Sequence, residues 1–342
     1  MTQWDDFLIR ASLSDNGSLP RQLSWVSPDI IPYGISPVAN PAAQFCNAPS
    51  YATDPGSSPI YNATNYLYVR AKNLKAGANT GTVFLYYSNS NLLQYPSSWL
   101  NNPIGNPDGL PISAANIGDI VTPTQAFVWP QTPPQPANFH YCLIAWVKTA
   151  AHGTLPTTDA VADLAAFMAE NGNWSQRNIA ITEAGSPTFV KSVNYSQGTE
   201  PATMNFSLTW DYPPIGAQVQ LVARDPAGGK VINSEIQTIQ AQNSGFVIPQ
   251  IPIPGGYKTI FDINYFANGK VPQKSFTLTL NAYYFVPPTQ KTLLGYARDM
   301  HGFGIGHLPL AMTGQPMLEA AVGIGPQKAV LVGTQEILAL VP

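Results

Sequence analysis

Charged side chains are scarce in this sequence. Asp, Glu, Lys and Arg make up 10% of its 342 residues, whereas they make up roughly 25% of an ordinary soluble domain. The formal net charge is −3, so the surface is nearly neutral and has no attraction for nucleic acid or an anionic membrane. We therefore predict no nucleic-acid partner. The polar surface must come from Asn, Gln, Ser and Thr, which together with 33 Pro favours an all-β protein with many turns.

Long apolar runs are missing as well. No window approaches the roughly 18 consecutive apolar residues that a membrane-spanning helix needs, so we predict no transmembrane segment. The N-terminal stretch MTQWDDFLIRASLSDNG has two early acidic residues and no basic region followed by an apolar run. This excludes a Sec signal peptide from our expectations, and any export would be leaderless. The sequence leaves the location of the protein unknown.

Cysteine and histidine are rare, with two and four residues respectively. We predict that Cys46 and Cys142 are free thiols and that Cys142 is buried as a small apolar side chain. His140 and Cys142 lie two residues apart on one strand face, as two metal ligands do. No CxxC or HxxxH motif supplies the further ligands that zinc needs. Core packing is therefore the better interpretation of this pair.

Motifs of catalysis and cofactor binding are also absent. The sequence holds no GxSxG, no DxDxDG calcium loop and no GxGxxG after a strand. His301 and His307 flank the run GFGIG beside Asp299, and we interpret that stretch as a Gly-rich turn rather than a metal loop. Asp5 and Asp6 lie in a terminal segment, away from other acids. We predict no cofactor, no metal site and no enzymatic activity.

Strand patterns are abundant, and the length favours two domains. The stretch 138–147 (NFHYCLIAWV) is apolar on both faces, which predicts a central, buried strand. A second strand follows within 171–181 (NGNWSQRNIAI). Between them we predict one helix, capped by Thr157 or Thr158 and ended by Asn171-Gly172. Its apolar face repeats at i, i+3, i+4 and i+7 and consists of Val161, Leu164, Ala165 and Met168.

The first domain is predicted to open with a hairpin. In YLYVRAKN, Leu67, Val69 and Ala71 alternate with polar residues, which is typical of a strand with one face in water. The turn LKAGANTG leads to TVFLYYS, its predicted partner strand. The preceding 27–41 stretch is interrupted by Pro and is expected at a sheet edge. Residues 1–30 are expected to form an extension that packs on something else.

The pattern restarts after Gly185. Met204, Phe206, Leu208 and Trp210 alternate with polar residues, and four further strand-like stretches follow at the spacing of a second sandwich. We place the boundary at 183–187. The predicted organisation is an extension (1–30), a first immunoglobulin-like sandwich (31–184), a second sandwich (185–288) and a Gly-rich extension (289–342) with a terminal hairpin.

The stretch FHYCLIAWV, a short helical excursion and then NGNWSQRNIAI resemble the end of immunoglobulin-like domains of the CARDB type. The opening stretches YLYVRAKN and TVFLYYS are similar to that family's first hairpin. The resemblance covers about residues 31–182. The family consists of adhesion-like modules of bacterial secreted and surface proteins, and the resemblance implies a seven-stranded sandwich with a binding or spacer role. It supplies no catalytic residues.

A contact surface is predicted on the long loop 89–111, because loops beyond about 12–15 residues are commonly functional. Tyr95, Trp99, Asn101 and Asn102 are its candidate residues for a glycan or protein partner; alternatively, Trp99 folds back onto the first core. We interpret the protein as a bacterial binding or structural module on a surface or within an assembly. A leaderless toxin or effector component and a capsid or tail protein are the alternatives, and a homo-oligomer is left open.

Overall fold

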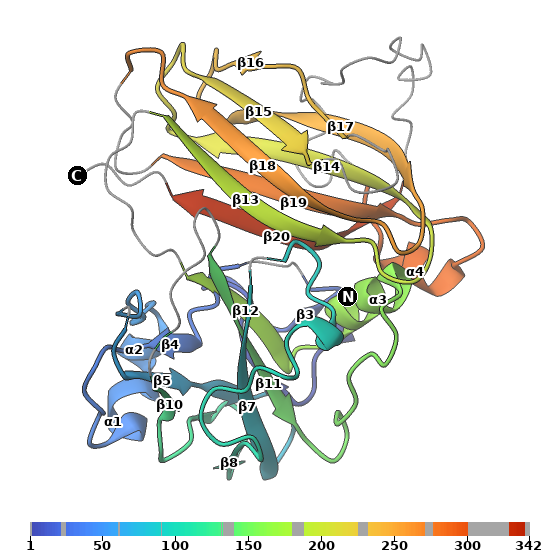
Figure 1. Ribbon diagram of the computed structural model, residues 1–342. Helices are drawn as coiled ribbons and strands as arrows, with labels where there is room; N and C mark the ends of the chain where they lie inside the picture. The colour runs from blue at the N-terminus through green and yellow to red at the C-terminus, as the bar shows by residue number, and fades with distance from the viewer. Residues whose placement is uncertain are drawn as a thin grey trace. The chain divides into compact units, whose positions relative to one another are not determined.

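The computed structural model describes residues 2–21, 25–60, 62–89, 91–130, 132, 140–179, 188–224, 232–270, 276–299 and 328–338. The chain is all-β, with 44% strand and 10% helix, and its sheets are antiparallel. This confirms the predicted fold class (Figure 1). The chain divides into two compact units. The first comprises Met1–Asn89, Tyr95–Thr157 and Phe167–Ile181, and the second comprises Ser90–Gln94, Thr158–Ala166 and Thr182–Pro342.

The first unit is a sandwich of one four-stranded sheet against two three-stranded sheets. The four-stranded sheet has the order β12 (Trp174–Ile179), β11 (Tyr141–Lys148), β7 (Asn79–Asn89), β8 (Leu110–Ala114). The second sheet has the order β10 (Phe127–Trp129), β5 (Asn65–Val69), β4 (Ile30–Pro32). The third has the order β2 (Phe7–Leu8), β6 (Ala71–Asn73), β9 (Ile120–Val121). A small ribbon pairs β1 (Thr2–Gln3) with β3 (Ser18–Leu19).

The core of this sandwich lies between the facing sheets. Leu67 and Val69 of β5 join the same apolar cluster as Leu85 of β7 and Leu143 of β11. As predicted, β11 is central and buried between β12 and β7. The predicted pairing of residues 66–73 with 82–88 is wrong, because β7 pairs with β11 and β8 instead. The two apolar faces meet across the core, so their strands belong to opposite sheets.

The outer face of β5 is not in water, contrary to the sequence prediction. Tyr68 and Arg70 are 1% and 0% exposed. The cause is the segment 33–64 between β4 and β5, which we call the excursion. It contains α1 (Pro41–Phe45) and α2 (Ala48–Tyr51). Phe45 of α1 packs on Tyr68 and Ile31, forming a small second core on that face.

The N-terminal segment is part of the first unit. Phe7, Leu8 and Ile9 are fully buried, and β2 pairs with β6. The Pro-interrupted stretch supplies β4, which lies at a sheet edge as predicted. Helix α3 (Val161–Glu170) forms where the apolar repeat predicted it. Among the described residues, no helix is long and apolar enough to cross a membrane.

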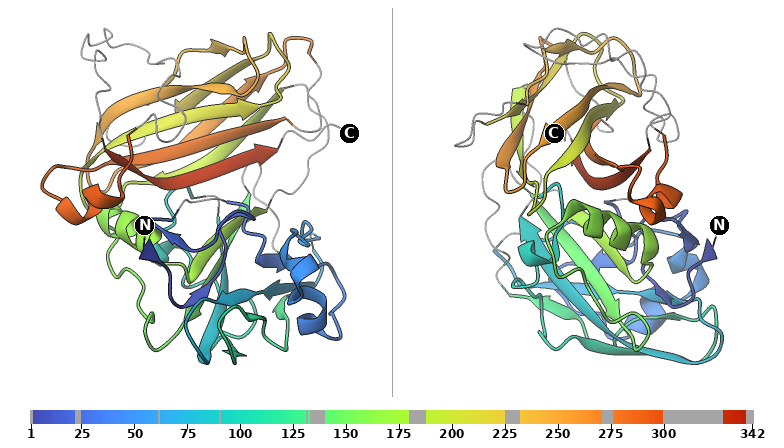
Figure 2. Two further views of the ribbon diagram at one scale, coloured as in Figure 1. Left: turned by 180° about the vertical axis from the view of Figure 1, so that it is seen from behind. Right: turned by 90° about the vertical axis from the view of Figure 1, so that its right-hand side faces the viewer.

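The second unit is a sandwich of two four-stranded antiparallel sheets. One has the order β13 (Thr188–Ser196), β18 (Lys258–Phe266), β15 (Gln218–Ala223), β16 (Gln237–Thr238). The other has the order β17 (Ser244–Ile253), β14 (Ala202–Asp211), β19 (Thr277–Phe285), β20 (Ala329–Leu338). Figure 2 shows the strands of this unit from two further sides. Phe206 of β14 packs on Tyr195 of β13 and Phe261 of β18, with ring centroids 5.5 and 5.1 Å apart, which joins the two layers. Helix α4 (Lys291–Tyr296) follows β19.

Two strands of this unit differ from the sequence prediction. Strand β17 was not predicted, because Pro249 and Pro252 argue against a strand. It lies at a sheet edge, where a β-bulge opposite Met204–Phe206 accommodates it. Strand β20, expected in a terminal hairpin, pairs with β19. The predicted boundary at 183–187 lies outside the described residues, and the domain limits stay a prediction.

Candidate functional site

The predicted contact residues of the loop 89–111 lie mostly inside the protein. Trp99 is fully buried and its ring packs on Tyr86, with centroids 4.9 Å apart. Tyr95 is 3% exposed. Asn101 is exposed and Asn102 is half-buried. The structure thus brings the two aromatic rings into the interior and leaves the amides nearer the surface; a contact role for the four residues stays a prediction.

This loop also continues the ladder of β7. The N–H of Tyr87 donates to the carbonyl of Asn102 at 3.1 Å, and the N–H of Ile104 donates to the carbonyl of Leu85 at 2.8 Å. The short 3₁₀ helix η1 (Pro96–Ser98) precedes Trp99. The backbone on both sides of Trp99 is therefore fixed by hydrogen bonds.

The residues considered as metal ligands do not converge in the described part of the chain. Cys142 is buried, and its Sγ lies 3.2 Å from Oδ1 of Asn178. Neither cysteine is in a disulfide, as predicted. No group of three or more His, Cys, Asp or Glu residues within the described ranges is arranged to hold a metal ion. His301 and His307 lie outside the described residues.

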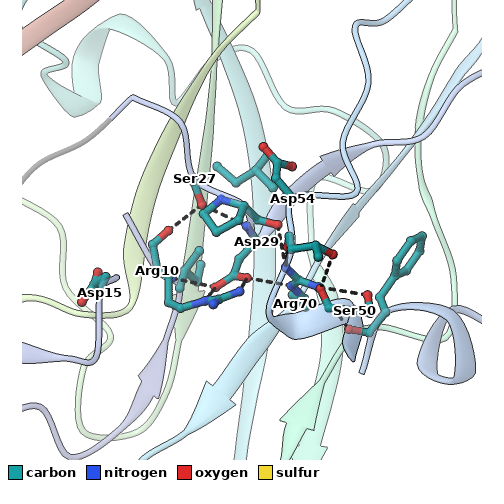
Figure 3. Close-up of polar contacts among 12 residues, drawn as sticks. Arg10, Asp15, Ser27, Asp29, Ser50, Asp54 and Arg70 are labelled. Atoms are coloured by element: carbon teal, nitrogen blue, oxygen red, sulfur yellow. Dashed lines mark hydrogen bonds and ion pairs between the residues drawn. The ribbon is translucent and has the colours of Figure 1, made fainter. Parts of the chain in front are cut away.

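A buried ion cluster in the first unit is the most developed polar site of the described chain. Asp29, which precedes β4, lies between Arg10 and Arg70 (Figure 3). Its Oδ1 lies 2.8 Å from Nη2 of Arg10 and 2.7 Å from Nε of Arg70. Nε and the backbone N–H of Arg10 both donate to Oδ2, at 3.0 and 2.8 Å. The three side chains are at most 5% exposed.

Arg70 connects this cluster to the excursion. Its guanidinium donates to the backbone carbonyls of Phe45 at 3.3 Å, Ser50 at 2.8 Å and Thr53 at 2.9 Å. The carbonyl of Pro28 accepts a further bond at 3.1 Å. A guanidinium has five N–H groups in a fixed planar fork, so one buried side chain holds both short helices to the sheet. Arg70 lies between β5 and β6, at a position that continues the polar side of the β5 alternation.

Tyr51 closes the cluster on the side of α2. The guanidinium carbon of Arg10 lies 3.4 Å from the centroid of the Tyr51 ring, which is cation–π geometry. Burial raises the pKa of the Tyr51 phenol, and the charge of Asp29 adds to this. Burial also raises the pKa of the Cys46 thiol, to about 11. Both groups are thus neutral at physiological pH.

The exposed face of the excursion carries no unpaired charge. Asp54 is its one charged residue in the sequence, and both carboxylate oxygens accept from Nη1 of Arg177, at 2.8 and 2.9 Å. Ile35 and Ile60 are 56% and 49% exposed. The side chains of Asn40 and Asn47 cap α1 and α2 by accepting from backbone N–H groups. The described part of the excursion is therefore a surface segment with capped helices, and its one charged side chain is paired.

A second polar cluster surrounds Asp6, which is 1% exposed. Its carboxylate accepts from Thr149 at 2.5 Å and Asn79 at 2.7 Å, and it lies 2.7 Å from Nδ1 of His152. The His152 ring packs against Trp4, with centroids 4.2 Å apart. Burial raises the pKa of Asp6, but these side-chain hydrogen bonds and that of the Phe7 N–H outweigh burial, so the pKa ends below its ordinary value.

This lowered pKa predicts acid sensitivity. In the unfolded chain an aspartate has a pKa of about 3.9, so near that pH the unfolded state binds more protons than the folded state. The stabilisation is present above this pKa and is lost as the pH falls through the lower folded value. We expect Asp6→Asn to be less stable than the wild type at pH 6 and to approach it at pH 3. Urea unfolding at both pH values measures this. A stability difference that does not change with pH would contradict it.

Sequence reasoning did not find either cluster. Asp29 and Arg70 are 41 residues apart, and Asp6 and His152 are 146 apart, so no local motif joins them. The one available signal was Arg70, a charged residue in the middle of a strand pattern.

Comparisons with known proteins give no family. No family model matches the sequence, and the search of curated proteins found no match. Among solved structures, one that resembles it is a red sea bream transglutaminase, with 12% sequence identity and a TM-score of 0.22. The alignment covers 67% of this chain and 28% of the transglutaminase chain.

This match corrects one prediction. We predicted that the chain is not an enzyme, and the matched structure is that of an enzyme. The exclusion of enzymatic activity is therefore withdrawn. A TM-score of 0.22 carries no activity, substrate or catalytic residue over to this chain.

Proposed function

We propose that this protein is a binding or structural module of an assembly, and that the excursion 33–64 makes its contact with a protein surface. The observation that carries the proposal is the Asp29–Arg70 cluster, which holds a surface segment with a single, paired charge to the sheet. The immunoglobulin-like topology and the binding or spacer role implied by the CARDB-type resemblance are part of this proposal.

The composition of the excursion supports a protein contact. Interface cores are depleted of charged residues relative to the rest of the surface. The excursion has one acidic residue, which is paired with Arg177. Its exposed positions carry mostly Ala, Pro, Asn, Ser and Thr, together with Gln44, Asp54, Ile35 and Ile60. Covering such a surface with a partner avoids the large free-energy cost of burying unpaired charges.

The ordering of the excursion supports the same conclusion. Holding a loop in its bound conformation beforehand reduces the entropy lost on binding. The hydrogen bonds of Arg70 and the two asparagine caps fix α1 and α2 before any partner arrives. The buried cluster thus makes a polar, Pro-rich segment into a rigid surface.

A second copy of the chain is the binding partner used to test this proposal, because its surface is also sparsely charged, with 10% charged residues in the sequence. We expect the wild type to associate with itself in sedimentation velocity, and Ile35→Asp to weaken this association about tenfold or more by placing a charge in the contact. The matched control is Ile117→Asp, since Ile117 is 60% exposed in another part of the first unit.

The control should associate as the wild type does. Equal association of the two Asp variants, or a wild type that stays monomeric at high concentration, would refute the proposed assembly contact. Circular dichroism of each variant checks that the fold is unchanged.

A further inference from the structure

The second unit contains a piece of chain from far outside its main segment. Residues 91–94, which we call the strap, follow β7 in sequence but pack within the second unit. Leu92 and Leu93 are each 1% exposed and Gln94 is 2% exposed. Such burial is that of a core element and not of a surface loop.

The strap joins the edge strands of both sheets. Asn91 forms a parallel bridge with Asn194 of β13, and the N–H of Leu92 donates to the carbonyl of Asn194 at 2.8 Å. On the other sheet, Nε2 of Gln335 in β20 donates to the carbonyl of Asn91 at 2.7 Å. Both β13 and β20 are edge strands in their sheets. The strap therefore closes the open side of the sandwich.

The fit at β20 requires a glycine. The carbonyl oxygen of Leu92 lies 2.1 Å from the place that a Cβ on Gly333 would occupy. Two heavy atoms cannot approach so closely, so any larger residue at 333 must push the strap away. Glycine in a strand commonly marks such a close approach of another backbone.

An edge strand presents unpaired N–H and C=O groups that pair readily with another extended segment. We propose that the edges of β13 and β20 form a binding groove for an extended segment with two adjacent leucines, filled in this chain by its own strap. When the strap leaves, the groove accepts the strap of a second copy, because the same bonds to Asn194 and Gln335 form whichever chain supplies the segment. This exchange of one element between copies is a domain swap.

The test uses two full-length variants that complement one another. Leu92→Ser/Leu93→Ser leaves the groove intact but removes the apolar anchors of the strap. Gly333→Ala leaves the strap intact but blocks the groove. Both carry Ile35→Asp, so that association through the excursion does not contribute. We expect each variant alone to be monomeric in light scattering and their mixture to form a 1:1 heterodimer.

A mixture that stays monomeric overturns the proposal, and so does dimerisation of the groove-blocked variant alone. If the double Ser variant fails to fold, Leu93→Ala replaces it.

The second measurement is binding of a synthetic peptide of residues 89–95. The peptide should bind the open-groove variant and should fail to bind when Gly333→Ala is added. Gly295→Ala is the control, since a Cβ there meets nothing within 4 Å. A failure of the excursion contact alone leaves these outcomes unchanged.

Discussion

Replacing Asp29 by asparagine is expected to lower the free energy of unfolding by about 3–5 kcal/mol, the range measured when one partner of a buried ion pair is removed. Asp29 is fully buried and is bonded to two arginines that are at most 5% exposed. Asparagine keeps the size of the side chain but removes the negative charge, so both guanidinium groups remain buried without an anion. Chemical denaturation of the wild type and the variant measures the loss.

Asp54→Asn is the matched control for this substitution. Asp54 also pairs with an arginine of the first unit, but its side chain is 33% exposed. Exposed pairs contribute about 0–1 kcal/mol, so the control should lose little. Similar losses of unfolding free energy at both positions would show that the buried cluster stabilises the protein no more than an exposed ion pair does.

Hydrogen exchange tests whether the cluster orders the excursion in addition to stabilising the fold. If Arg70 orders the excursion through Asp29, the amide hydrogens of Tyr51 and Cys46 should exchange faster in Asp29→Asn. These N–H groups bond to the carbonyls of Asn47 and Ala42 within the short helices. Unchanged exchange rates at these two amides would show that the cluster does not order the excursion.

Alternation of apolar residues was sufficient to predict the fold class and most strands. The burial of β11 and the apolar faces of β7 and β14 follow directly from side chains that point to opposite faces at successive positions. Helix α3 could also be predicted, since its apolar repeat and the Asn171-Gly172 pair that ends it are local signals. The pairing of β5 with β7 was predicted wrongly, because alternation identifies a face but not the neighbour in the sheet.

The site could not be predicted in the same way. The polar face of β5 has the pattern of a wet surface, yet the excursion covers it and buries Arg70. Nothing within a few residues of Arg70 indicates Asp29 or the carbonyls of α1 and α2. The strap was missed for a related reason: a short Leu-Leu stretch in a Pro- and Asn-rich loop has the composition of a loop, and its partners Asn194 and Gln335 are over 100 and 240 residues away.

Replacing Trp99 by alanine is the second substitution with a large expected effect. Trp99 is fully buried and packs on Tyr86 of β7. Truncating a buried tryptophan to alanine typically costs about 3–5 kcal/mol, because apolar contact is lost and a cavity remains. We expect a loss of this size in chemical denaturation, together with a lower melting temperature.

The comparison with Asn101→Ala makes this result decisive for the predicted loop surface. Asn101 is exposed, and surface substitutions away from special features usually change stability by about 0.5 kcal/mol or less. A large loss at Trp99 with none at Asn101 assigns the ring to the core of the first unit, and a contact role for Tyr95 and Trp99 then fails. Equal stability of Trp99→Ala and the wild type would instead mean that the ring contributes nothing to the core and is available to a partner.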